Sequence, residues 1–269
     1  MIALDSASDR LGVVSALLSR SVDLVKADLR EFVVKSSWSN VSTVIHCAAT
    51  VNPQISGTQA RSENTQLTQA AIKLANVLNA RLIFASTTSV YQRTESPRMF
   101  AQNVTGGTTE YSRGKLEDEG LIRSGSDRFT IVRLGSAYGP SLWINYRTAI
   151  NRVVSNSLAT GEFRSWRFAY DAISPHAPVA GIGQALTQVT SSEDFMGETL
   201  NYAPLSVDLR SIHETLKRMN PNVKLILEDH VNDSAKHLVL EPPDWTFGSA
   251  REPQLEANIQ ALVELGPGC

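Results

Sequence analysis

Apolar runs that alternate with helical patterns constrain the fold of this chain more than any other feature. In the first half, strands are expected at residues 22–27, 41–49, 81–87 and 128–135, and helices at 58–80 and 110–124. The run 41–49 is nearly continuous and β-branched, which is typical of a strand covered on both faces. Because short joints connect these elements, they are expected to form a parallel sheet with right-handed crossovers. Such sheets bind ligands at the carboxyl ends of their strands, so the residues after each strand are the first candidates for a site.

After Pro140 the pattern indicates a smaller α/β lobe. Helices are expected at residues 145–160, from about 179 onward, at 207–219 and at 253–265, with short strands at 199–203 and 223–227. The expected division places one domain in residues 1–141 and the lobe in residues 142–269, partly interleaved with the sheet.

Composition argues against several classes of protein. Of the 269 residues, 42% are hydrophobic and 19% are charged, which is typical of a folded globular protein. The net charge is −2 and no basic block occurs, so nucleic acid is not an expected partner. No apolar run suits a membrane helix, and the start does not resemble a signal peptide. With only two cysteines and no metal-ligand spacing among the five histidines, we expect a cytoplasmic protein without disulfides or metal.

The helix expected at 110–124 carries a tyrosine and a lysine four residues apart. Tyr111 and Lys115 therefore share one helical face. A tyrosine hydroxyl with a pKa near 10 is a poor base at neutral pH, but a nearby ammonium favours the phenolate. The lysine can also hold a ribose hydroxyl. Because this spacing also arises by chance, it is a weak signal alone. Asp118 and Glu119, further along the helix, are interpreted as a solvated face.

Two strand ends add to this signal. The segment FASTTSVYQ (84–92) ends a strand with four consecutive hydroxyl residues, a pattern that also marks ordinary turns. The segment HCAATVN (46–52) occupies the same end of the preceding strand, where small residues let a dinucleotide approach the backbone. His46 is expected in the core. Asn64, in the helix that follows, is placed to buttress the crevice.

At this point the chain resembles the extended short-chain dehydrogenase/reductases, the NAD-dependent epimerase/dehydratase family. The resemblance runs through VIHCAA, SENTQLTQA, RLIFASTTSVYQ, YSRGK and IVRLGSAYGP, and continues weakly through SPHAPVAGIGQAL and EPQLEANIQALVEL. It implies a Rossmann-type, doubly wound parallel sheet over residues 1–141, a substrate lobe over 142–269, a nicotinamide cofactor and hydride transfer.

The same resemblance implies roles for individual residues. Tyr111 matches the proton-transfer residue, Lys115 its ribose-binding partner, and Thr87 the hydroxyl that orients substrate, with Ser86 as the alternative if the register slips by one. The residues implied to face substrate are Ser89, Ser136 and His176. Those implied to line the cofactor are Ala48, Ala49, Asn64 and Leu134, together with Lys115.

The family's glycine-rich turn is degenerate in this chain. In a first register the glycine positions fall on Ser6, Asp9 and Gly12, so only the third glycine is kept. Asp9 would then stand by the pyrophosphate, at a cost of about 4 kcal/mol at 4 Å and a dielectric of 20. The residues implied to contact the cofactor in this register are Ser6, Ser8, Arg10, Leu11, Asp28 and Leu29. Asp28 favours NAD over NADP, although Arg10 and Arg30 are suited to a 2′-phosphate.

In a second register, residues 1–20 form the second strand and helix of the family. Asp5 then becomes the ribose acid, Asp28 meets the adenine, and the glycine turn is missing from these residues. The first register is favoured because Met1 then begins a strand and SASDRLG keeps the small residues of the turn. Both registers weaken cofactor binding relative to a typical member.

The expected function is that of an NAD(P)-dependent oxidoreductase or epimerase/dehydratase. It would act on a hydroxyl or carbonyl of a small molecule, with nucleotide sugars among the candidates. VIHCAATVN is also similar to thioester reductases of the same superfamily, so an acyl thioester is also a candidate substrate. The alternatives are a cofactor-free pseudoenzyme or binding protein of this fold, and a redox-neutral acid/base catalyst. Members of the family often form dimers, so a homodimer is one possible oligomeric state of this chain.

Overall fold

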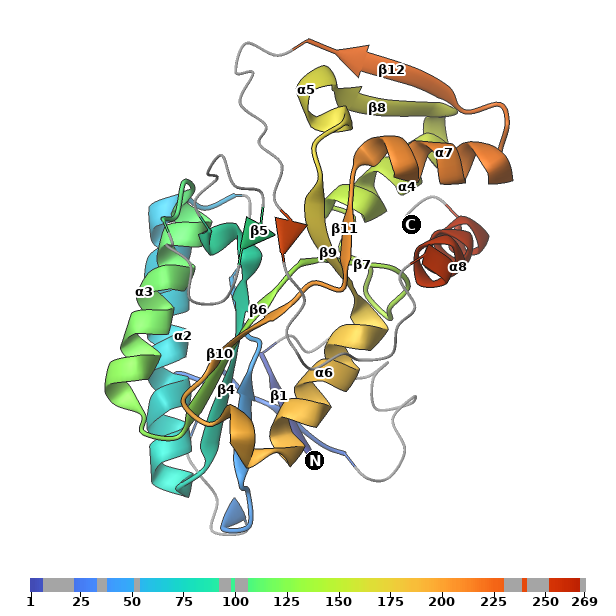
Figure 1. Ribbon diagram of the computed structural model, residues 1–269. Helices are drawn as coiled ribbons and strands as arrows, with labels where there is room; N and C mark the ends of the chain where they lie inside the picture. The colour runs from blue at the N-terminus through green and yellow to red at the C-terminus, as the bar shows by residue number, and fades with distance from the viewer. Residues whose placement is uncertain are drawn as a thin grey trace. The chain divides into compact units, whose positions relative to one another are not determined.

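The computed structural model describes residues 1–6, 22–32, 38–50, 54–91, 98–99, 106–229, 239–240 and 252–266. The chain divides into two compact units (Figure 1). Unit 1 comprises Met1–Ala85, Gly107–Ile131 and Met196–Glu198, and unit 2 comprises the rest of the chain. In the described residues, no helix has the length and apolar character required to cross a membrane.

The strands of unit 1 pair in parallel, as the alternating pattern predicts. β1 (Ile2–Asp5) pairs with β2 (Asp23–Lys26), with Ile2 opposite Asp23. β3 (Thr43–His46) pairs with β4 (Arg81–Thr87), with His46 opposite Phe84. A four-stranded sheet has the order β10-β6-β4-β3. Of its other two strands, β6 (Phe129–Leu134) begins in unit 1 and ends in unit 2, and β10 (Thr199–Tyr202) belongs to unit 2. The α/β fold with a parallel sheet is therefore confirmed.

Two long helices pack against each other in unit 1 (Figure 1). These are α2 (Gly57–Leu78), which begins at the cap of Ser56, and α3 (Glu110–Gly125). The core between the helices and strands is formed by Ala71, Ala75, Leu82, Phe84, Ile122 and Ile131. β3 is less covered than its apolar sequence predicts, because Ile45 is 42% exposed. The expectation that this strand is covered on both faces is therefore wrong.

Unit 2 contains a three-stranded sheet and a parallel strand pair. The sheet has the order β11-β9-β7, formed by Leu205–Val207, Ser174–Pro178 and Ser136–Tyr138. β8 (Glu162–Trp166) pairs in parallel with β12 (Lys224–Glu228). Two further short strands, β5 (Arg98–Met99) and β13 (Val239–Leu240), also pair in parallel.

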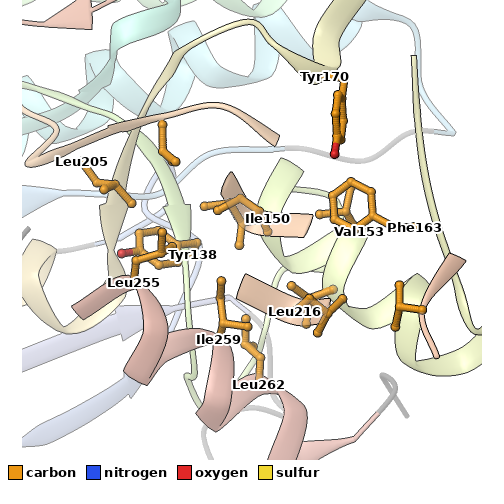
Figure 2. Close-up of a cluster of buried hydrophobic side chains, with 14 residues drawn as sticks. Tyr138, Ile150, Val153, Phe163, Tyr170, Leu205, Leu216, Leu255, Ile259 and Leu262 are labelled. Atoms are coloured by element: carbon orange, nitrogen blue, oxygen red, sulfur yellow. The ribbon is translucent and has the colours of Figure 1, made fainter. Parts of the chain in front are cut away.

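The helices of unit 2 surround an apolar core. They are α4 (Ala149–Thr160), α5 (Arg167–Tyr170), α6 (Val179–Ser191), α7 (Leu209–Met219) and α8 (Glu252–Leu265), with short 3₁₀ turns at Thr88–Val90 and Glu193–Phe195. Figure 2 shows side chains of α4, α7 and α8 meeting in this core, among them Ile150, Leu216 and Ile259. The helix expected from residue 145 begins at Ala149 instead. Asn145 and Thr148 form a turn first, because the Asn145 side chain accepts the Arg147 N–H at 3.0 Å.

Candidate active site

The start of α3 fixes the tyrosine and lysine of the expected motif. Thr109 caps the helix, and its side chain and that of Ser112 exchange hydrogen bonds with each other's backbone N–H in a capping box. This defined start sets the helical phase of the residues that follow. Tyr111 and Lys115 consequently lie one turn apart on the same face, as their spacing predicts.

Lys115 is buried and its amine is held at the carboxyl end of β4. The side chain is 6% exposed, and Nζ donates a hydrogen bond to the carbonyl oxygen of Ala85 at 2.9 Å. Nζ also lies 4.4 Å from the centre of the Phe84 ring, a distance at which an ammonium is attracted to the ring face. Burial lowers the pKa of Lys115, and the negative charge of Asp118 opposes that shift.

Tyr111 and Lys115 line the same hollow between α2 and α3. This hollow, which we call the Tyr111 hollow, has a volume of about 250 Å³. Tyr111 is 44% exposed. The residues that line the hollow are Thr50, Ile55, Gly57, Ala60, Arg61, Asn64, Glu110, Tyr111, Gly114, Lys115 and Asp118. The structure thus brings together the tyrosine, the lysine and Asn64 of the predicted site.

Asn64 fixes the loop that follows β3. Its Oδ1 accepts the backbone N–H of Thr50 at 2.6 Å, and its Nδ2 donates to the Thr50 carbonyl at 3.2 Å. Both groups of the amide are therefore used by the protein backbone. The role that this geometry supports is the buttressing of the strand end at Ala48 and Ala49, where the sequence places the cofactor.

The hydroxyl cluster after β4 belongs to unit 2. Ser86 is 4% exposed and Thr87 is 9% exposed, whereas Ser89 is exposed. Thr87 Oγ1 accepts the Ser89 N–H at 3.2 Å and also contacts the Ser89 hydroxyl at 3.2 Å. This pairing caps the short 3₁₀ turn at Thr88–Val90 and orders the cluster.

Three further predicted residues lie on paired strands of unit 2. Leu134, at the end of β6, and Ser136, at the start of β7, are half-buried. Ser136 lies opposite His176 of β9. His176 is 1% exposed, its Nε2 lies 2.8 Å from the Ser174 hydroxyl, and burial lowers its pKa to about 4. In this structure His176 is thus an interior residue, and a contact between it and substrate stays a prediction.

A second hollow of unit 1, of about 520 Å³, collects the described residues of the predicted adenosine region. Ser6, Asp28, Leu29, Ala48 and Ala49 all line it. Small residues at its rim suit the close approach of a nucleotide, although Leu29 also packs on the apolar core of unit 1. Ser8, Arg10 and Leu11, together with Asp9 and Gly12 of the degenerate turn, lie outside the described residues.

The carboxylate of Asp28 is already engaged by Arg30. It accepts the Arg30 backbone N–H at 2.8 Å and the Arg30 Nε at 2.9 Å. These hydrogen bonds hold the pKa of Asp28 down at about 2. Before Asp28 can accept ribose or adenine groups, the Arg30 side chain has to move or share the carboxylate.

The pairing of β1 can be compared with the two registers in which the first residues align with the strands of the family. In the order 3-2-1-4-5-6 of a dinucleotide-binding sheet, the first strand lies between the second and the fourth. In the first register β1 is that first strand and should pair with both β2 and β3. β1 pairs with β2, and these are neighbouring strands in both registers. The choice between the registers, and with it the expectation for Ser6, therefore stays a prediction.

Unit 2 has an apolar hollow of about 480 Å³ after β7. Its lining residues are Ala137, Ser141, Leu142, Trp143, Asn145, Asn151 and Val179. Leu142 is 58% exposed and Trp143 is 40% exposed. None of these residues carries a charge, so the described lining suits an uncharged, largely apolar group.

The sequence interpretation missed one member of the Tyr111 hollow. Asp118 and Glu119 were expected on a solvated face, but they are 1% and 0% exposed, so that expectation is wrong. α3 packs on α2, whose Thr65 and Thr68 hydroxyl groups face Asp118. Spacing was a usable signal, because Asp118 lies three residues after Lys115 and seven after Tyr111, on the same helical face.

Comparison with known proteins agrees with this architecture. A family model of NAD-binding domains described as "Male sterility protein" matches residues 21–180, more than half of the chain. A curated relative, the isonitrile lipopeptide synthase of Streptomyces coeruleorubidus, is 26% identical over 229 residues. That match covers 79% of this chain, and the chain spans about 15% of the length of that relative.

Solved structures show the same fold. The UDP-glucuronic acid 4-epimerase from Bacillus cereus, solved with UDP-glucuronic acid and NAD, has a TM-score of 0.81 at 16% identity, covering 98% of this chain and 91% of that one. An NAD-dependent NDP-hexosamine 5,6-dehydratase involved in tunicamycin biosynthesis has a TM-score of 0.73 at 14% identity, covering 91% and 83%. The family match and the fold together show that this chain belongs to the male sterility protein family of NAD-binding domains, within the extended short-chain dehydrogenase/reductases.

Proposed function

We propose that this chain is a nicotinamide-dependent oxidoreductase that acts on the hydroxyl or carbonyl group of a small molecule. The observation that carries the proposal is the buried position of the Lys115 amine. Its buried amine, anchored on the Ala85 carbonyl at 2.9 Å, lines one hollow with the accessible Tyr111. A structural lysine has little reason to bury its charge beside an exposed tyrosine, whereas a lysine that tunes a phenol needs that arrangement.

The chemistry assigned to the chain is proton transfer. A bound nicotinamide supplies the hydride acceptor or donor. During oxidation Tyr111, as phenolate, accepts the proton of the substrate hydroxyl, and during reduction it donates a proton to the carbonyl oxygen. The Lys115 ammonium favours the phenolate, with each pKa unit worth about 1.4 kcal/mol. Thr87 is proposed to share the substrate oxygen, with Ser86 as the alternative.

The described residues fit a dinucleotide in part. Small residues at the end of β3 leave room for a nucleotide beside Asp28, and Asn64 holds that strand end in place. The pairing of Asp28 with Arg30 gives the adenosine end one anionic and one cationic group. NAD, which several structural neighbours contain, and NADP are therefore both candidates, with the cation as the group suited to a 2′-phosphate.

Two substrate classes follow from the relatives. A nucleotide sugar, as bound by the UDP-glucuronic acid epimerase, is one candidate. An acyl thioester is the second, and two observations favour it: the lipopeptide synthase relative, and the uncharged lining of the hollow at Leu142 and Trp143. A nucleotide sugar carries a diphosphate, which needs cations or several N–H donors, while an acyl chain needs apolar surface.

The test is turnover with each substrate class and the cofactor in the matching oxidation state. Purified chain is incubated with medium-chain acyl thioesters and NADH or NADPH, or with UDP-sugars and NAD or NADP. The change in absorbance at 340 nm is followed together with the product by mass spectrometry, which also detects an isomerised or dehydrated sugar formed without net change in the cofactor. Tyr111→Phe should reduce kcat by about 10²- to 10⁴-fold. Tyr146→Phe, the same change at a half-buried tyrosine that does not line the Tyr111 hollow, should leave kcat unchanged. Full turnover by Tyr111→Phe would remove the proton-transfer role. A chain that binds neither cofactor would contradict the oxidoreductase role and leave the binding protein and the redox-neutral acid/base catalyst as the alternatives.

A further inference from the structure

The Tyr111 hollow contains a buried carboxylate that the proposed chemistry does not use. Asp118 lines this hollow one turn beyond Lys115 and is 1% exposed. Its Oδ1 has no hydrogen-bond partner in the described part of the protein. Because a buried carboxylate with an unpaired oxygen is costly, its presence beside the lysine calls for a specific reason.

The surroundings of Asp118 determine how readily it ionises. Burial raises the pKa of Asp118 to about 6, and the Lys115 ammonium is the largest influence in the opposite direction. From α2, the hydroxyl groups of Thr68 and Thr65 also favour the carboxylate, whereas the neighbouring Glu117 disfavours it. The other charged or titratable groups that line the hollow are Arg61, Glu110 and Tyr111.

Lys115 depends on Asp118 for its charge. The amine has one hydrogen bond to an uncharged carbonyl, and burial disfavours its protonated form. Among the groups that favour the ammonium, Asp118 has the largest influence, ahead of Cys47 and Glu119. An ionised Asp118 is therefore the counter-charge that keeps a buried lysine protonated.

The hydroxyl of Thr68 connects this pair to a buried histidine. Thr68 Oγ1 lies 3.2 Å from His46 Nε2, and both residues are nearly inaccessible. His46 packs on the Phe84 ring with centroids 5.5 Å apart, and the Lys115 ammonium lies over that same ring. Burial and the lysine charge lower the pKa of His46 to about 3, so this imidazole stays neutral. It therefore contributes no cation that would compete with Lys115 for Asp118.

We propose that Asp118 is a positioning residue that keeps the Lys115 amine protonated for its action on Tyr111. The inference rests on the proposed function and names the group that sets how far the ammonium persists as the pH rises. While Asp118 is ionised, its charge raises the pKa of Lys115, so the ammonium remains to favour the phenolate of Tyr111. Without that charge the amine would lose its proton at a lower pH, and the phenolate would lose its cation with it.

The direct test measures Lys115 itself and does not require turnover. The full chain is labelled with ¹³C-lysine, and the Cε resonance of Lys115, assigned with Lys115→Arg, is titrated by NMR. In Asp118→Asn the pKa of Lys115 should fall by at least about one pH unit, because a unit charge one helical turn away is removed. Asp127→Asn, which removes an exposed carboxylate of the same unit, should leave it unchanged. An equal pKa of Lys115 in Asp118→Asn and the parent chain overturns the proposal.

Two further variants separate positioning from simple structural damage. Asp118→Glu keeps the charge and should restore the Lys115 titration. Thr68→Val removes a hydroxyl that favours the carboxylate, so the pH at which Asp118 protonates should rise and the Lys115 resonance should report it. This variant serves as the test if Asp118→Asn does not fold, and an unmoved transition in it counts against the proposal.

Activity distinguishes this proposal from the proposed function. Where turnover is measured, the alkaline limit of the kcat profile should move to lower pH in Asp118→Asn, because Lys115 then loses its proton at a lower pH, while the parent and Asp127→Asn should share one limit. If the pKa of Lys115 falls in Asp118→Asn but the chain binds no cofactor, the proposed function has failed and the dependence of Lys115 on Asp118 stands. If the pKa of Lys115 is unchanged in Asp118→Asn but the chain is an active enzyme, the proposed function stands and the role of Asp118 has failed.

Discussion

Lys115 Nζ donates a hydrogen bond to the carbonyl oxygen of Ala85, and this 2.9 Å contact ties α3 to the carboxyl end of β4. The contact explains how an amine on a helix comes to lie at a strand end, which is where parallel sheets bind their ligands. It also explains why the amine is buried although its side chain starts on an amphipathic helix. The buried position of Lys115 and the groups around it determine how substitutions at this site should behave.

Lys115→Met should separate the catalytic role of the charge from its structural one. The methionine side chain can still pack on Phe84, and at about pH 5, where Asp118 is protonated, neither a buried amine nor an unpaired carboxylate has to be desolvated, so the free energy of unfolding should not fall at that pH. The turnover number should nevertheless fall by at least about 10²-fold, because the phenolate of Tyr111 loses its cation. Urea unfolding and kcat measure the two effects. Lys73→Met, at an exposed position of α2, is the control and should change neither.

Arg30→Ala should change the choice of cofactor. In the parent chain Arg30 holds the carboxylate of Asp28 through its backbone N–H and its guanidinium. Removing the guanidinium frees the carboxylate for ribose or adenine groups and removes a cation suited to a 2′-phosphate. The ratio of Kd for NADPH to Kd for NADH, measured by fluorescence titration, should rise by about tenfold, or about 1.4 kcal/mol.

Arg128→Ala removes an exposed arginine that does not line the hollow of Asp28 and should leave this ratio unchanged. An Arg30→Ala protein with the parent ratio would show that this ion pair lies outside the cofactor site.

Asp118→Asn should stabilise the protein at neutral pH even where it impairs activity. The pKa of Asp118 is about 6 in the folded protein against 3.8 ordinarily, so the folded state binds this proton more tightly than the unfolded state. The free energy of unfolding therefore falls as the pH rises from about 4 to 6 and stays level above. Removing the carboxylate should recover on the order of 2–3 kcal/mol at pH 8 and little near pH 4. Urea unfolding at both pH values checks this, and a variant less stable than the parent at pH 8 would contradict it.

Tyr91→Phe should destabilise unit 2 without reporting on catalysis. The Tyr91 hydroxyl donates to Asn201 Oδ1 at 2.5 Å and accepts from Arg133 Nη1 at 3.1 Å, and Tyr91 and Arg133 are buried. Removing the hydroxyl leaves buried polar groups with fewer partners, at a cost of about 1–3 kcal/mol. The midpoint of urea unfolding should fall accordingly, while cofactor affinity stays that of the parent. Loss of cofactor binding in the folded variant would instead place Tyr91 in the site.

Local patterns predicted the elements whose sequence signals agree with one another. The strand expected at 81–87 is β4 (Arg81–Thr87), and the helix expected at 110–124 is α3 (Glu110–Gly125). In both, an apolar period coincides with a clear boundary, such as the Thr109 cap of α3. His46 is buried as expected, because it lies in the apolar run of β3. These signals depend on residues close in sequence, which is why they can be read without the structure.

The sequence interpretation failed where tertiary contacts override local preference. β9 (Ser174–Pro178) is the central strand of its sheet although it contains Pro175 and Pro178, which lack the N–H that a central strand normally uses. The sequence indicates no strand at these residues and only a helix from about residue 179. The burial of Asp118 and Glu119 was likewise missed, because only the packing of α3 on α2 shows which helical face is inside.

In the candidate site, too, local sequence patterns were predictable and tertiary contacts were not. The pairing of Tyr111 with Lys115 was predictable from a four-residue spacing, and the structure places both on the Tyr111 hollow. The engagement of Asp28 by Arg30 was not predictable, because it depends on how one exposed side chain turns back on its neighbour. The roles of Thr87, Ser89 and Leu134 stay predictions.

Calorimetric titration of the purified full chain with NADH and NADPH at low ionic strength shows whether Lys115 lies in a cofactor site. We expect saturable binding of at least one of the two with one site per chain, weakened by at least about tenfold in Lys115→Met and unchanged in Lys73→Met. Absence of binding by both cofactors at several millimolar, or equal binding by the parent and Lys115→Met, would contradict it.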